Sequence, residues 1–181
     1  MEMTTKPLSM TMMYNQLDER VRIMYTFNIG DSRNVCVNED DDVTIADENS
    51  GKRAFFVDRR WVRFVQEIPN IDRAIQRAIL YKPTNFQYHL GGQWYVRVSD
   101  WFHNIVDIRR WYIRVGFNSA LRPTIDGISL TYTQWENLKK AVKQMNELFP
   151  QFAVISTCHH VNQRGELHNC CDCNPIPPNC M

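Results

Sequence analysis

The sequence predicts an α+β protein of two tandem units, each a four-stranded antiparallel sheet with one C-terminal helix, packed together as an intramolecular pseudo-dimer. Apolar and polar residues alternate over 95–99 and 106–109, which is typical of half-buried strands. After Leu130 the period changes, and apolar residues three and four apart from Trp135 to Phe149 form one helical stripe. The same order of patterns occurs upstream, which predicts the second unit of the pair.

The upstream pattern matches the downstream one position by position. At a constant offset of 74 residues, two helical stripes correspond: Trp61, Phe64, Ile68, Ile71 and Ile75, and Trp135, Leu138, Val142, Met145 and Phe149. Extended segments correspond as well, 34–38, 43–45 and 54–56 before the first helix and 95–99, 106–108 and 128–130 before the second. Any strand that is followed by an amphipathic helix has a similar spacing of apolar residues. Coincidence is therefore the alternative to duplication. A unit of about 60 residues buries little apolar surface alone, so two units in one chain can complete each other's core.

These elements predict the organisation of the chain. The segments are an N-terminal arm at 1–24, a first, degenerate unit at 25–80, a linker at 81–85, a second unit at 86–150 and a Cys/His-rich tail at 151–181. The Met-rich arm lacks a clear period and is interpreted as a mobile leader or a short docking helix. Pro69 should kink or interrupt the first helix near Ile68. Thr131 or Thr133 can cap the second helix.

Charge and hydropathy limit the function classes. The net charge is only +1, but residues 27–80 hold eight Lys/Arg against ten Asp/Glu, and residues 86–149 hold eight against five. A basic surface is therefore expected on the second unit. No apolar run approaches the roughly 20 residues of a membrane span, and the N-terminus lacks a secretory signal. We expect a soluble intracellular protein that is not secreted and has no membrane partner.

Aromatic and basic residues lie close together on the predicted strands of the second unit. Single-stranded nucleic acid needs this mixture, because cations follow its phosphates and flat rings stack on its unpaired bases. The predicted contacts are Trp94, Arg97, Trp101, Arg109, Arg110, Tyr112, Arg114 and Arg122. Tyr95 and Trp111 belong either to the core or to this platform. Strand alternation points Tyr112 inward unless the strand bulges or twists there.

Several motifs of the second unit stand in a family-like order: VDIRRWY at 106–112, Arg122-Pro123, GISL at 127–130 and QWxxLK at 134–139. In this order they resemble the positive cofactor four family of single-stranded-DNA-binding transcriptional coactivators, whose members dimerise through their helices. The resemblance implies that Trp101 stacks on a base and that Arg109 is the strand arginine. Tyr112 stands where the family has a tryptophan, and Arg122 where it has a lysine. The turn at 102–104 lacks the family's lysine, and Ile125-Asp126 replaces its basic pair.

The first unit is expected to bind nucleic acid less well. Its turn at 38–42, Asn-Glu-Asp-Asp-Asp, would repel phosphates and is either a solvated charge run or a site for a protein partner. Basic residues can still line an edge of this unit: Arg33, Lys52, Arg53, Arg59, Arg60 and Arg63. We interpret this unit as a copy that completes the fold.

The C-terminal tail is rich in potential metal ligands. A zinc site is possible with ligands from Cys158, His160, His168, Cys170 and Cys173, because Cys170 and Cys173 have C-x-x-C spacing. A disordered thiol-rich tail and disulfides are the two alternatives. The tail is also a candidate partner-binding appendage. No cofactor is otherwise required.

The sequence shows no catalytic motif, neither a phosphate-binding glycine loop nor a nucleophile elbow, so we expect no enzyme. The leading prediction is a single-stranded-DNA-binding protein of transcription or replication, located in the nucleus or another intracellular DNA compartment. Transcription or replication proteins are possible partners, and further oligomerisation stays open. The alternative is a structural or protein-interaction module that kept the fold without DNA binding. Single-stranded RNA is a third possibility, and a diverged copy with an unusual tail would suit a viral genome.

Overall fold

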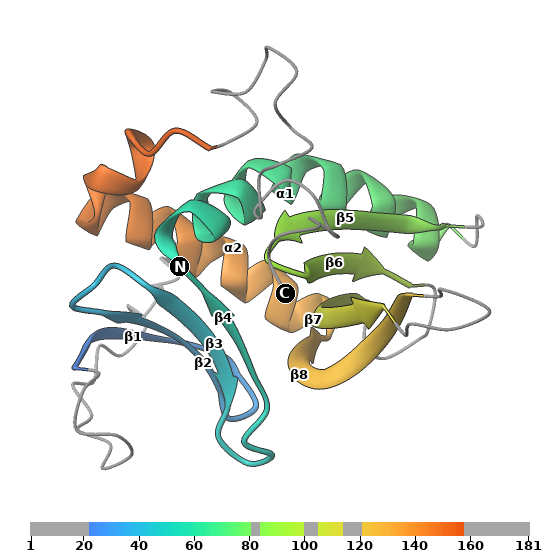
Figure 1. Cartoon of the computed structure of the whole chain (residues 1–181), viewed down its shortest axis with the longest axis horizontal. Coiled ribbons are helices and arrows are strands. Elements are labelled where there is room, and N and C mark those ends of the chain that lie inside the picture. The colour runs from blue at the N-terminus through green and yellow to red at the C-terminus, as the bar shows by residue number, and fades with distance from the viewer. Residues whose placement is uncertain (1–21, 81–83, 100–104, 114–120, 158–181) are drawn as a thin grey trace, which may run out of the picture.

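The structure, a computed structural model, describes residues 22–80, 84–99, 105–113 and 121–157. It contains two four-stranded antiparallel sheets in meander order, each followed by a helix (Figure 1). The first unit comprises β1 (Ile23–Gly30), β2 (Arg33–Asn38), β3 (Val43–Asp47), β4 (Arg53–Phe56) and α1 (Asp58–Ile79). The second unit comprises β5 (Phe86–Gly91), β6 (Trp94–Val98), β7 (Val106–Ile113), β8 (Leu121–Leu130) and α2 (Tyr132–Leu148), followed by the short 3-10 helix η1 (Pro150–Ala153). The predicted α+β class is confirmed.

The two sheets have the same register at their buried positions. Three pairs of the first sheet, Val35–Ile45, Val37–Val43 and Ile45–Ala54, correspond to Val96–Ile108, Val98–Val106 and Ile108–Ile128 of the second. The first hairpins also agree, since the register shifts between Asn28 and Gly30 in one unit and between His89 and Gly91 in the other. The backbone pairing of the two units is therefore equivalent, which is consistent with two tandem units.

Both helices bury the stripes that the sequence predicted. The largest buried side chains are Trp61 and Phe64 on α1 and Trp135 and Leu138 on α2. Thr131 begins α2 with a capping box, because its hydroxyl accepts from the Gln134 amide while the Gln134 side chain accepts from the Thr131 amide.

The first helix is not interrupted near Ile68, because α1 continues through Pro69 to Ile79, and the other form of that prediction, a kink, stays a prediction. Pro69 lies on the exposed side of the helix. The missing amide hydrogen removes one backbone hydrogen bond there. Burial of Phe64 and Ile71 on either side anchors the helix against the core and offsets that loss.

Each helix lies against the sheet of the other unit, α1 on β5 and β6 and α2 on β1 (Figure 1). The contacts at the two helix starts are equivalent. The Gln134 side-chain amide donates to Asp31 in the β1–β2 turn over 3.2 Å. The Arg60 guanidinium occupies the space that a side chain at Gly92, in the β5–β6 turn, would need. Since β4 also lies beside β8, the two units share one continuous core.

A partly buried polar contact joins the two helices. The Trp135 indole nitrogen donates to an Asp72 carboxylate oxygen over 2.7 Å, and the Lys139 ammonium lies 3.1 Å from the same carboxylate. The Phe64 and Trp135 rings meet edge to face with centroids 6.1 Å apart. The helix–helix packing thus combines apolar burial with a satisfied buried donor.

The structure shifts two predicted boundaries. β1 begins at Ile23, inside the segment expected as an N-terminal arm. Residues 150–157, most of which were assigned to the tail, fold back on the core instead. Phe152 is buried against Phe149, with ring centroids 5.8 Å apart, and Thr157 is buried as well. Pro150 ends α2 without ending the packed structure, because it begins η1.

Candidate nucleic-acid interface

The described residues of the predicted site separate into two groups on the second sheet. Arg110 and Tyr112 on β7 and Arg122 on β8 form one group, named here the Tyr112 patch. Arg97 on β6 and Arg109 on β7, with Asp107 between them, form the other, named the Arg109 group. Asp107 pairs with Arg97 across the strands and precedes Arg109 by two positions, so all three share one face.

The Tyr112 patch is open to solvent although it has the strand parity of the buried Ile108. Tyr112 is 45% exposed, and Arg110 and Arg122 are exposed as well. Tyr112 pairs directly with Arg122 across β7 and β8. Beyond Arg109 the register shifts, because β8 contains extra residues at 124–126, and the Thr124 hydroxyl donates to the Arg110 carbonyl over 2.8 Å. The Tyr112 ring is thus exposed, with Arg122 as its cross-strand partner and Arg110 two residues before it on β7.

The Arg109 guanidinium is engaged within the protein. It donates to both Asp107 oxygens over 2.9 to 3.2 Å and to the Thr124 carbonyl over 2.9 Å. The hydrogen bond with Asp107 raises the pKa of Arg109, an effect that burial of the guanidinium opposes. Arg97 is exposed and forms no ion pair with a described residue. The freer cation of this group is therefore Arg97.

The close approach of β7 and β8 explains why a glycine, Gly127, lies opposite Arg109. A Cβ atom at this position would lie 2.6 Å from the Ile108 carbonyl oxygen and 2.8 Å from the Arg109 Cα. Both neighbours are backbone atoms that cannot move aside easily. Only glycine lets β8 approach β7 this closely below the Arg109 side chain.

Three aromatic side chains lie together near the Arg109 group. The His89 and Tyr95 ring centroids are 4.8 Å apart, and those of Tyr95 and Trp111 are 6.2 Å apart. Tyr95 and Trp111 are 7% and 8% exposed, and burial raises the pKa of the Tyr95 hydroxyl. The buried Tyr95 and Trp111 rings therefore offer little surface to a base.

The expectation that Trp94 is an exposed stacking ring is not met. Trp94 is only 9% exposed, and its ring lies 6.3 Å from that of Phe56 in the first unit. It has the same inward parity as Val96, and the contact between the two units covers it. Trp94 therefore serves the core.

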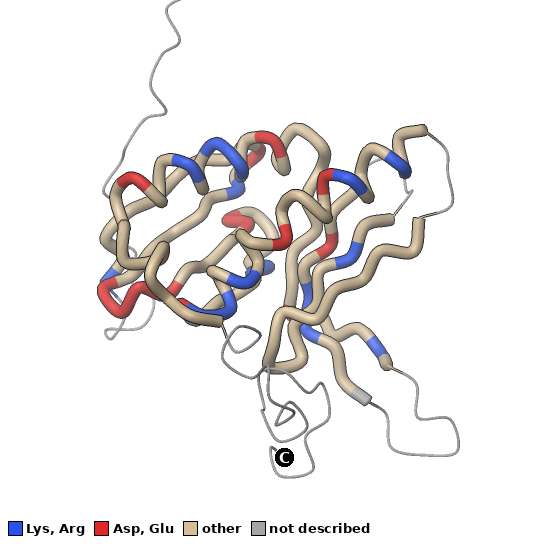
Figure 2. Tube along the Cα trace, turned by 90° about the horizontal axis from the view of Figure 1, so that it is seen from above, with Lys and Arg blue, Asp and Glu red and all other residues tan. Residues whose placement is uncertain are grey.

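Figure 2 shows Lys and Arg on the strands in one half of the molecule and a run of acidic residues at the opposite end. The acidic turn at 39–42 is held in shape by Asn38, whose side-chain oxygen accepts from the amides of Asp40 and Asp42 over 3.0 and 2.8 Å. Burial is the main cause that raises the pKa of Asp42, and the charges of Asp40 and Asp58 add to it. This ordered acidic turn belongs to the first unit, the unit with the more negative residue count.

Several predicted site residues lie outside the described residues. They are Trp101 and Arg114 of the second unit and the candidate zinc ligands Cys158, His160, His168, Cys170 and Cys173. Within the described ranges, no group of three or more His, Cys, Asp or Glu side chains could hold a metal ion. No helix of the described part is long and apolar enough to cross a membrane.

Comparison with known proteins bears on the second unit. Residues 89–141 match the family model for Transcriptional Coactivator p15 (PC4). This segment is PC4-like. No curated protein and no solved structure matches the chain. The match contains both the Tyr112 patch and the Arg109 group. The first unit lies outside the PC4-like range, so its origin as a second copy stays an interpretation.

Sequence reasoning missed the partners of the predicted arginines. Asp107 stands two residues before Arg109 in the VDIRR run, and this i, i+2 spacing on a strand places both on one face. That spacing could have indicated the ion pair. Gln93, whose side-chain oxygen accepts from Arg110 over 3.2 Å, gave no comparable signal because it comes from the adjacent turn.

Proposed function

We propose that this protein binds single-stranded DNA on the sheet of its second unit and acts in transcription or replication as a coactivator-like factor. The observation that carries the proposal is the exposed Tyr112 between Arg110 and Arg122, inside the PC4-like segment. The function needs no cofactor. It places the protein in the nucleus or another compartment that holds DNA, with transcription or replication proteins as possible partners.

Binding would combine stacking with phosphate contacts. The Tyr112 ring stacks on an unpaired base, which contributes about 1–3 kcal/mol. Arg110 and Arg122 contact phosphates beside the stacked base. Arg97 contacts phosphates on the other face of the same sheet, where Arg109, held by Asp107, mainly shapes the surface. A duplex hides its base faces, so this surface selects single strands. Trp101 and Arg114 stay predicted contacts of the same surface.

The test compares two equally exposed tyrosines. Tyr112→Ala and Tyr132→Ala remove rings that are 45% and 44% exposed, and Tyr132 lies at the start of α2 outside the Tyr112 patch. Fluorescence titration with oligo-dT and with a duplex of equal length, at two salt concentrations, measures affinity and preference. We expect Tyr112→Ala to weaken oligo-dT binding about 5- to 150-fold. Tyr132→Ala should bind as the unchanged protein does.

Equal effects of the two substitutions would contradict a stacking role for Tyr112. Absence of binding by the unchanged protein at low salt would favour the alternative, a protein-interaction module. The engaged guanidinium of Arg109 and the buried ring of Trp94 are the observations that favour this alternative. Tighter binding to oligo-U than to oligo-dT would identify RNA as the ligand.

A further inference from the structure

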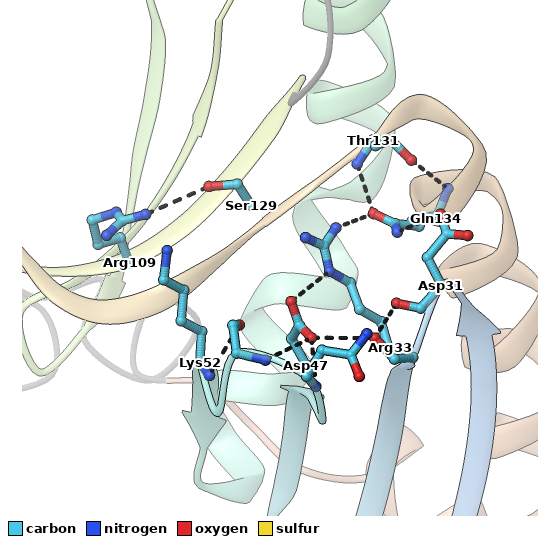
Figure 3. A network of polar contacts seen from close by, with 11 residues as sticks. Asp31, Arg33, Asp47, Lys52, Arg109, Ser129, Thr131 and Gln134 are labelled. Carbon is cyan, nitrogen blue, oxygen red and sulfur yellow. Dashed lines mark hydrogen bonds and ion pairs between the residues drawn. The ribbon is translucent and has the colours of Figure 1, made fainter.

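The first unit presents a cation, Lys52, to the part of the second sheet that carries the Arg109 group. Lys52 lies in the turn between β3 and β4, and both strands lie beside β8. Figure 3 shows the Lys52 side chain extending from this turn toward Arg109 and Ser129. Lys52 is exposed, and no ion pair joins it to a described acidic residue. The Arg109 group therefore has a basic neighbour from outside the PC4-like segment.

The turn that carries Lys52 is fixed by its own hydrogen bonds. The Asp47 amide donates to the Lys52 carbonyl over 2.9 Å, and the Gly51 amide donates to the Asp47 carbonyl over 2.9 Å. The Asp47 carboxylate accepts from the Asn49 and Ser50 amides over 3.0 and 3.3 Å. Gly51 has a φ of +68°, a left-handed conformation that glycine adopts without steric penalty.

A polar network ties this turn to the second unit. Arg33 forms an ion pair with Asp47 at 3.6 Å and donates to the side-chain oxygen of Gln134. Gln134 is the capping-box residue of α2, and its side-chain oxygen also accepts from the Thr131 amide over 2.9 Å (Figure 3). Thr131 directly follows β8. The network thus fixes the turn of Lys52 relative to the strand that lies next to Arg109.

We propose that Lys52 is a phosphate-binding residue of the single-stranded-DNA surface, so that this surface is completed by the first unit. The inference rests on the proposed function. Its physical reason is charge, because Asp107 neutralises Arg109 and leaves Arg97 as the free cation of that group. Lys52 adds a second free cation on a turn that is already ordered, so little backbone entropy is lost on binding.

The test measures the salt dependence of oligo-dT binding for the full chain and three variants. Lys52→Ala removes the charge, Lys52→Arg keeps it, and Lys143→Ala removes another exposed lysine, from α2. Loss of one phosphate contact should reduce the slope of log Kobs against log salt by about 0.7. At low salt, we expect Lys52→Ala to bind about fivefold more weakly. Lys52→Arg and Lys143→Ala should keep the slope of the unchanged protein.

The outcomes separate this inference from the proposed function. If the unchanged protein binds oligo-dT and Lys52→Ala has the same slope, the role of Lys52 is wrong and the proposed function stands. Equal losses in Lys52→Ala and Lys143→Ala would also overturn it, since net charge alone would then explain the effect. If the unchanged protein does not bind oligo-dT, both proposals fail. Thermal unfolding of each variant checks that the fold is intact.

Discussion

The outer faces of the two sheets differ at equivalent positions, although their inner faces agree. Where the second unit has Tyr95, Arg97, Asp107 and Arg109, the first has Asn34, Cys36, Thr44 and Ala46. The inner positions are buried aliphatic residues in both. The same pairing of strands therefore supports a charged aromatic face in one unit and a small polar face in the other. The buried positions determine the common fold, and the two units differ in the side chains of their outer faces.

One cross-strand pair shows how backbone and side chain adjust together. Ala46 pairs with Arg53 in the first unit, while Arg109 pairs with Gly127 at the same place in the second. The arginine of this pair lies on the fourth strand, β4, in the first unit and on the third strand, β7, in the second. In the second unit this exchange turns the guanidinium toward Asp107 and requires glycine beneath it.

The largest expected effect comes from filling the space at Gly127. Gly127→Ala places a Cβ atom against the backbone of Ile108 and Arg109, so it should lower the free energy of unfolding by about 3 kcal/mol. Gly51→Ala is the matched control, since nothing lies within 4 Å of its added Cβ. Its left-handed backbone should still lose about 1 kcal/mol. Urea unfolding measures both, and equal losses would show that close strand approach is unimportant.

Trp61 and Trp135, at equivalent positions of the two helices, allow a second comparison of the units. The Trp135 indole donates to Asp72, whereas the buried indole nitrogen of Trp61 has no hydrogen-bond partner. Trp135→Phe should therefore destabilise the protein by about 1–2 kcal/mol more than Trp61→Phe, because only the first change removes a hydrogen bond to a charged group. Urea unfolding of both variants gives the difference. A larger loss of unfolding free energy in Trp61→Phe than in Trp135→Phe would contradict a stabilising hydrogen bond between Trp135 and Asp72.

Periodicity predicted the fold well, because core positions repeat with the spacing of strands and helices. The stripes from Trp61 and from Trp135 are buried, and Thr131 caps its helix as expected. Pro69 does not interrupt α1, because a proline on an exposed helix face is tolerated when the turns around it are packed. The loss of one backbone hydrogen bond at Pro69 is smaller than the stabilisation from burial of Phe64 and Ile71.

The candidate site was harder to predict because it depends on contacts between segments distant in sequence. Strand alternation within one unit could not reveal that Phe56 of the other unit covers Trp94. The exposure of Tyr112 depends on the extra residues at 124–126 of β8. The place of Lys52 beside the second sheet depends on how the two units pack, which no pattern within one unit contains.

The smallest expected effect concerns the pH dependence of the turn that carries Lys52. Burial alone would raise the pKa of Asp47, but hydrogen bonds from Ser50 and Asn49 and the charge of Arg33 together lower it below its ordinary value. A carboxyl group with a lowered pKa in the folded state stabilises the protein above the pKa of the unfolded chain, about 4. That stability is lost as the pH falls through the lower, folded-state value. Asp47→Asn keeps an acceptor for the turn but removes the charge.

The melting temperature of Asp47→Asn should therefore lie below that of the unchanged protein near neutral pH. The gap should close as the pH falls below the ordinary carboxyl range, because Asp47 is then protonated in both states. Asp126→Asn is a suitable control, since Asp126 is exposed on β8 and has no described ion pair. A gap that persists at acid pH would mean that turn geometry, rather than the Asp47 charge, stabilises the contact between the two units.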